Sequence, residues 1–123
     1  MRRLVPFSVV LAGLVALSGC AVRQADLTAI STRNVKLDGI DLDRAPGKRV
    51  WGVSKKFVVL FIPLGMPTIE EAVDDALDRA GGDFMTDAVV YTDEWSAVVI
   101  GQQVVKVKGT VVDTRHLGTG ASR

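Results

Sequence analysis

Apolar residues at helical spacing make residues 68–82 the clearest element in the chain. Thr68 can cap the start of a helix, and Glu71 three residues later completes a capping box. Six apolar positions then fall on one helical face: Ile69, Ala72, Val73, Ala76, Leu77 and Ala80. Gly81-Gly82 supplies a stop signal at the carboxyl end. The pattern predicts one amphipathic helix.

Elsewhere the apolar pattern predicts strands. The β-branched and aromatic run Phe57–Ile62 is stopped by Pro63 and is typical of a buried strand within residues 50–62. Residues 103–112 alternate, with Val105, Val107 and Val111 on one side and Lys106, Lys108 and Thr110 on the other. Such alternation indicates a sheet that is wet on one face.

Strand character is also expected at residues 35–42, with a phase slip at Asp38-Gly39, at 88–92, and at 96–101 after a turn near Asp93-Glu94, where it leads into the alternating residues 103–112. The resulting order is β-β-α-β-β. We therefore expect an α+β fold, in which a small antiparallel sheet of about four strands is packed by one helix.

The N-terminus has the parts of an export signal. Arg2 and Arg3 precede the apolar stretch Leu4–Leu17, which ends in Leu17-Ser18-Gly19-Cys20. The stretch is shorter than the roughly 20 apolar residues that a membrane-spanning helix needs. The tetrapeptide resembles the lipobox of bacterial lipoproteins. That resemblance implies cleavage before Cys20, attachment of diacylglycerol to its thiol, and acylation, with palmitate for example, of the new amine.

Ala21 follows the cysteine, where Asp would retain a lipoprotein in the inner membrane by the enterobacterial sorting rule. The lipobox resemblance therefore implies the periplasmic face of the outer membrane, with the inner membrane as the less favoured location. The alternative is a chance cysteine at the end of an ordinary signal.

We expect four segments in the chain: a lipoprotein signal peptide (1–19), a lipidated N-terminus and tether (20–33), a small periplasmic α+β domain (34–114) and a flexible tail (115–123). Removing residues 1–19 takes two of the 15 basic residues and none of the 14 acidic ones, so the net charge falls from +1 to about −1. This balance argues against nucleic acid as a partner. No second cysteine is present for a disulfide.

A series of short motifs over residues 50–112 resembles the TRL-like family of small bacterial lipoproteins. The motifs are Phe61-Ile62-Pro63-Leu64-Gly65, Thr68-Ile69-Glu70-Glu71-Ala72-Val73, Gly81-Gly82-Asp83, Asp87-Ala88-Val89-Val90 and Lys106-Val107-Lys108-Gly109-Thr110-Val111. The resemblance implies a strand–PxG–helix–GGD–strand–strand layout behind a lipobox. Many members have more cysteine than this chain. The family has no settled molecular activity, so no catalytic residue is implied.

A basic cluster around an aromatic residue is the main candidate interaction surface. Lys48, Arg49, Lys55 and Lys56 flank Trp51 and could contact lipopolysaccharide phosphates or an acidic partner. The alternative is an edge strand protected by lysines.

Trp95 and Tyr91 lie near the predicted Asp93-Glu94 turn, where they line a ligand surface or simply pack against the core.

Other polar groups do not form a recognisable site. Glu70, Glu71, Asp74, Asp75 and Asp78 give an acidic helix face, which favours a solvated surface over a cation site. A lone histidine, His116, is a poor metal ligand. Ser54, Ser96 and Ser122 lack a G-x-S-x-G setting. We expect no enzyme activity, metal or cofactor.

These observations predict a non-catalytic, membrane-anchored lipoprotein. Its domain is expected to bind an envelope protein or polymer, or to associate with itself. The alternative is a periplasmic small-ligand or metal-binding sensor, with a pocket between the helix and the Trp95 turn.

Overall fold

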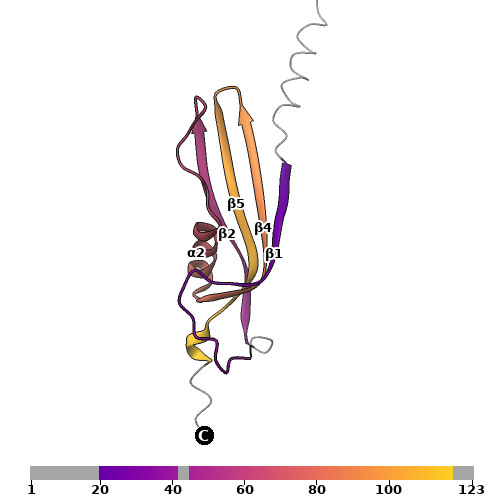
Figure 1. The fold of residues 1–123 in the computed structure, drawn as a ribbon, viewed down its shortest axis with the longest axis vertical. Helices are drawn as coiled ribbons and strands as arrows, with labels where there is room; N and C mark the ends of the chain where they lie inside the picture. Colours follow the sequence, from indigo (N-terminus) through magenta and orange to yellow (C-terminus); the bar gives the residue numbers. More distant parts are fainter. Residues whose placement is uncertain (1–19, 42–44, 118–123) are drawn as a thin grey trace, which may run out of the picture.

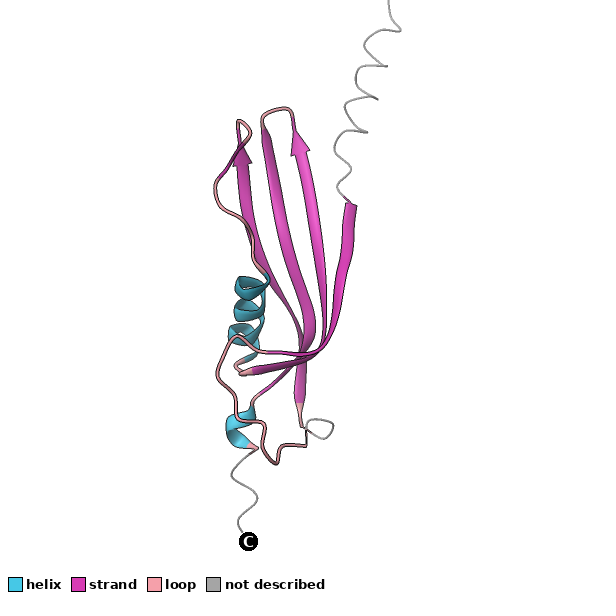
Figure 2. Cartoon of the chain, viewed as in Figure 1, coloured by secondary structure: helices cyan, strands magenta, loops and turns pink. Residues whose placement is uncertain are grey.

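A five-stranded antiparallel sheet carries one helix on one face (Figures 1 and 2). The computed structural model describes residues 20–41 and 45–117, so the predicted signal peptide lies outside the described residues. The elements are β1 (Cys20–Ile30), β2 (Gly47–Val59), β3 (Ile62–Pro63), α2 (Ile69–Ala80), β4 (Phe84–Ala97), β5 (Ile100–Val112) and the 3₁₀ helix η1 (Thr114–His116). The strand order is β1-β4-β5-β2-β3.

The α+β class and the antiparallel sheet with a helix packed on it are confirmed, but the sheet of the described residues has five strands and not about four, and the position expected for the first strand is wrong. Residues 35–41 form no strand, and Cys20–Ile30, which falls within the expected tether, pairs with β4 along its length. A register shift between Arg23 and Ala25 breaks the alternation of β1, so the sequence pattern conceals the strand. The predicted tail is also partly ordered: it begins inside η1, and its last residues, 118–123, lie outside the described residues.

The predicted turn at Asp93-Glu94 is wrong, because β4 runs straight through it. Asp93 forms an ion pair with Lys106 of β5, and Glu94 lies opposite Gln103, so both acidic residues have cross-strand neighbours. The chain reverses instead at Val98-Val99, between the paired residues Ala97 and Ile100.

Helix α2 begins and ends where the sequence predicts. The Thr68 hydroxyl accepts a hydrogen bond from the Glu71 amide at 3.1 Å, and Gly81 ends the helix in the left-handed conformation with φ 74°. The other hydrogen bond of a capping box, from the Thr68 amide directly to the Glu71 side chain, is replaced by two hydrogen bonds through Ser54. The Thr68 amide donates to the Ser54 hydroxyl of β2 at 3.3 Å, and Ser54 in turn donates to the Glu71 carboxylate.

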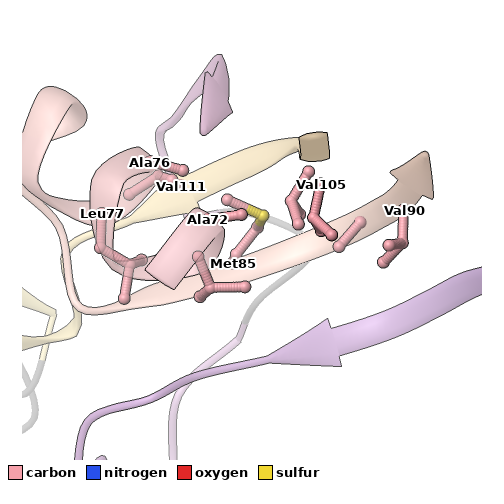
Figure 3. Packing of buried hydrophobic residues seen from close by; sticks show 10 residues of the cluster. Ala72, Ala76, Leu77, Met85, Val90, Val105 and Val111 are labelled. Carbon is pink, nitrogen blue, oxygen red and sulfur yellow. The ribbon is translucent and has the colours of Figure 1, made fainter. Parts of the chain in front are cut away.

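The core lies between α2 and the lower part of the sheet (Figure 3). It consists of Ala72, Val73, Ala76, Leu77, Met85, Ala88, Val90, Val105, Val107 and Val111. The predicted inward positions of β5 are thereby confirmed. The helix crosses β2 at Gly52, where a Cβ atom would lie 1.8 Å from the Ala72 carbonyl oxygen. Only glycine permits this approach.

The run Phe57–Ile62 is not a buried strand. Phe57 is 49% exposed, Phe61 82% and Ile62 64%, because this end of β2 extends past the helix to a hairpin turn (Figure 1). A continuous apolar run indicates contact with something apolar on both sides, and the sequence pattern does not say that this must be the protein's own core.

Candidate functional site

Two hairpin turns meet at one end of the sheet, opposite the end that carries η1 (Figure 1). Leu60-Phe61 connects β2 to β3, and Val98-Val99 connects β4 to β5. The Leu60 amide donates to the Val99 carbonyl at 2.7 Å, which joins the two turns. We call residues 57–66 and 96–101 together the apolar tips.

The apolar tips expose many large hydrophobic side chains. Phe61 and Val98 are the most exposed, at 82% and 87%. An open groove of about 550 Å³ lies beside them. It is lined by Val58, Phe61, Pro63, Glu94, Trp95, Ser96, Ala97, Val98, Val99, Ile100, Gly101, Gln102 and Gln103. The predicted pocket wall from the helix is absent, since no α2 residue lines this groove.

The β2–β3 turn has an unusual backbone for its sequence. Leu60 and Phe61 have φ values of 49° and 65°, the left-handed region that two-residue hairpins usually fill with Asn-Gly. Each bulky residue in this region costs about 1–2 kcal/mol. The turn therefore keeps two large apolar side chains at a cost in backbone energy.

Cys20 lies at the same end of the sheet as the apolar tips. It is the first residue of β1, it is exposed, and it pairs with Glu94 of β4. Val98 follows Glu94 by four residues, so at about 3.3 Å per residue the β4–β5 turn lies roughly 13 Å beyond Cys20 along the sheet. Figure 1 shows β1 beginning below the level of both turns.

The predicted interaction residues separate onto two faces. Because Gly52 faces α2, alternation along β2 places Arg49, Trp51 and Lys55 on the helix-free face. Lys48 and Lys56 fall on the helix side, and the Lys56 ammonium pairs with Glu71 at 3.2 Å. The structure thus breaks up the predicted cluster.

Trp51 has its own partners on the helix-free face. Its ring lies 5.6 Å from that of Tyr91, and the Lys108 ammonium sits 5.0 Å from the Trp51 ring centroid. Trp51 remains 42% exposed. Trp95 lies further along, where its indole donates to the Gln102 side chain at 3.2 Å. We call Trp51, Tyr91 and Lys108 the aromatic patch.

The edge-strand interpretation of β2 agrees with the observed pairing. β2 pairs with β5 over its whole length but with β3 only at Val58 and Val59. On the open edge, the Val53 amide donates to the Asp75 carboxylate of α2 at 2.9 Å. A helix side chain thus satisfies part of the strand edge.

The acidic helix face is engaged within the protein and is not simply solvated. Asp74 accepts from Thr32, and Asp78 forms an ion pair with Arg33. Asp75 accepts from Arg79 at 3.0 Å.

The contacts that residues 31–33 make with the helix could not be predicted from the sequence, because polar residues of a loop follow no periodic pattern. The Arg33 guanidinium also donates to the Gly82 carbonyl at 2.8 Å, and the Ser31 hydroxyl donates to the Asp83 carbonyl at 2.7 Å.

Ser54 and Glu71 form the most organised polar contact. The hydrogen bond from Ser54, followed by that from Lys56, lowers the pKa of Glu71. Ser54 is 4% exposed, and its hydroxyl is occupied both as donor and as acceptor. This arrangement holds the helix start on β2.

Asp83 of the Gly-Gly-Asp motif also has a structural contact. Its carboxylate accepts from the amide of Thr114 at 2.8 Å and from the Thr114 hydroxyl at 2.6 Å. The motif therefore ties the end of the helix to the segment that follows β5.

Within residues 20–41 and 45–117, no three His, Cys, Asp or Glu side chains converge as metal ligands. Over the same residues, no helix has the length and apolar character required to span a membrane.

Comparisons with protein-family models, with curated proteins and with solved structures found no match for this chain. The resemblance to TRL-like lipoproteins therefore stays a prediction.

Proposed function

We propose that this chain is a bacterial lipoprotein acylated at Cys20, located at the periplasmic face of the outer membrane, with a non-catalytic interaction or assembly domain. The observation that carries the proposal is the exposed Cys20 thiol at the first residue of β1, directly behind the Leu-Ser-Gly tripeptide. A lipid on this thiol would leave the sheet undisturbed. The anchor would then join the domain with no intervening linker.

Two features support a role in interaction. The aromatic patch offers a half-exposed Trp51 beside the Lys108 cation, a combination that is common at protein interfaces and at sites for acidic partners. In the described part of the chain, β1 pairs only with β4, so its outer edge is open to another strand. A partner protein of the envelope or a second copy would fit these surfaces.

Metabolic labelling with an alkyne analogue of palmitate tests the anchor. The wild-type chain should take up the label, and Cys20→Ala should not. Trp51→Ala serves as the control and should be labelled like the wild type, because it leaves the lipobox intact. An unlabelled wild-type chain would overturn the proposed acylation.

Photo-crosslinking in cells tests the interaction role. A crosslinking amino acid replacing Trp51 should give a discrete product, either with an envelope protein or with a second copy. The same amino acid replacing Lys36, an exposed residue of the 31–41 segment, is the control. Equal and diffuse products from both positions would contradict an interaction surface at the aromatic patch.

The groove beside the apolar tips favours a second candidate, a small-ligand sensor. Its volume of about 550 Å³ falls within the range of ligand pockets, and Trp95 lines it. A thermal-shift screen of the purified lipoprotein would separate the candidates. A reproducible rise in Tm with one compound, abolished by Trp95→Ala, would favour the sensor.

A further inference from the structure

We propose that the apolar tips insert into the lipid surface of the membrane that holds Cys20. The domain would then contact this membrane through the lipid on Cys20 and through both hairpin turns. The orientation of this arrangement rests on the proposed acylation of Cys20. The occupant is the bilayer surface itself. Four observations carry the inference.

The first observation is the absence of charge. No charged residue occurs from position 57 to position 67 or from position 95 to position 105. Within these segments Leu60, Phe61, Val98 and Val99 form the two turns and remain exposed, between 46% and 87%. Contiguous exposed apolar surface of this kind marks a contact with a protein or a membrane.

The second observation is the reach of the tips. A lipid attached to Cys20 would put the membrane surface near the start of β1. The β4–β5 turn continues roughly 13 Å beyond the level of Cys20 along the sheet. Interfacial apolar side chains bury about 5–10 Å into the boundary between headgroups and acyl chains. With β4 upright, the tips reach this depth without any change in the fold.

The third observation is the pair of residues, Trp95 and Lys55, that lie where the apolar tips begin. Trp95 lies there with its indole hydrogen-bonded to Gln102, and Lys55 lies opposite Val104 on the same face of the sheet. Tryptophan is enriched at membrane interfaces, and lysine is attracted to anionic headgroups. Two of the residues predicted to form an interaction surface thus border the apolar tips.

The fourth observation is the strained turn. Asn-Gly at positions 60 and 61 would relieve the left-handed backbone, yet the chain has Leu60-Phe61 there. Residues that do not suit their local backbone conformation occur most often at functional sites. Retaining two large apolar side chains makes sense if lipid contact compensates for the strain.

The sequence before β1 points to the same occupant. Residues 1–19 join the sheet at Cys20 and contain the apolar stretch Leu4–Leu17. If they are cleaved, the lipid on Cys20 lies at this end; if they are retained, an apolar segment is joined to the chain at this end. Either outcome brings lipid to the end of the sheet that carries the tips. A second copy, or residues 1–19 themselves, would be competing occupants of the groove.

Quenching by lipids measures whether the tips enter the bilayer. The full chain carrying Val98→Cys is purified from membranes, labelled with an NBD fluorophore, and reconstituted in phosphatidylethanolamine–phosphatidylglycerol vesicles that contain doxyl-labelled lipids. Lys36→Cys, placed at the opposite end, is the matched control. A Cys20→Ser background is run in parallel, so that only the new thiol takes the fluorophore.

We expect quenching at position 98 to exceed that at position 36 several-fold. Adding Leu60→Ser and Phe61→Ser should reduce quenching at position 98 by half or more. Equal quenching at positions 98 and 36 would overturn tip insertion. Crosslinking between position 98 of two copies, without lipid quenching, would also overturn it and identify the occupant as a second copy.

The same samples separate this inference from the proposed function. Intact mass reports whether Cys20 carries lipid, whereas quenching reports where position 98 lies. Lipid on Cys20 without quenching leaves the lipoprotein proposal standing and removes tip insertion. Quenching in the Cys20→Ser background without lipid on the wild-type Cys20 does the reverse.

Discussion

Replacing Leu60-Phe61 by Asn-Gly should stabilise the fold while weakening contact with the membrane. Both residues have positive φ, at 49° and 65°, a conformation that costs a bulky residue about 1–2 kcal/mol. Asn and Gly adopt it readily. Relief of the backbone strain is therefore worth about 2–4 kcal/mol at most.

Two losses offset part of this gain. Leu60 is 62% exposed and Phe61 82%, so the apolar contacts that disappear amount to about 1 kcal/mol. The extra freedom of glycine in the unfolded chain costs about 0.5–1 kcal/mol. The net gain is about 1–2 kcal/mol, which raises the Tm of a domain of this size by about 5–10 °C.

Circular dichroism melts of the lipoprotein in detergent measure this shift, with Leu60→Ser/Phe61→Ser as the matched control. The serine pair removes the same apolar surface but keeps a Cβ atom at both positions, so it should not raise the Tm. Both pairs should lower lipid quenching at position 98. If the Asn-Gly variant melts no higher than the serine variant, the argument from backbone strain is wrong.

Three further predictions concern the fold around the helix. Gly52→Ala places a carbon atom 1.8 Å from a backbone oxygen of α2 and should lower the free energy of unfolding by at least about 3 kcal/mol. The control Gly101→Ala, whose added carbon has its nearest atom at 3.1 Å, should lower it less. Equal urea midpoints for the two variants would contradict the close helix crossing. Because the hydrogen bond from Ser54 lowers the pKa of Glu71, its contribution is complete above the ordinary value of 4.5 and is lost as the pH falls through the lowered value. The Tm difference between the wild type and Glu71→Gln should therefore shrink from neutral pH to about pH 3, and a constant difference would count against the contact. Asp83→Ala should cost about 1–3 kcal/mol and speed amide hydrogen exchange in residues 113–117, while unchanged exchange would show that the carboxylate does not hold this segment.

The helix and β5 could be predicted because their patterns are local. The capping residue Thr68, the apolar face of α2 and the alternation around Val107 each follow from a single repeat that the structure preserves. The first strand could not be predicted in this way. Its alternation is broken at Gln24, where a bulge shifts the pairing by one residue, and the residues that it pairs with in β4 lie 55 to 74 positions further along the chain.

In the candidate site, too, the features that local sequence patterns carry could be predicted, and those that depend on strand pairing could not. Cys20 is predicted from a short linear motif, and the sequence identified Trp51 and Trp95 as candidates. The joining of two hairpin turns at the end of the sheet where β1 begins depends on strand order and register, which no local pattern encodes. The apolar run Phe57–Ile62 shows the limit most clearly. Its apolar character is plain in the sequence, and only the length of β2 past the helix reveals that the run is exposed.

Intact mass spectrometry of the protein purified from its native membrane tests the central claim most directly. The account predicts a chain that begins at Cys20 and carries the added mass of a diacylglyceryl group and an amide-linked acyl chain. An unmodified Cys20, whether residues 1–19 are retained or removed at another site, would contradict it.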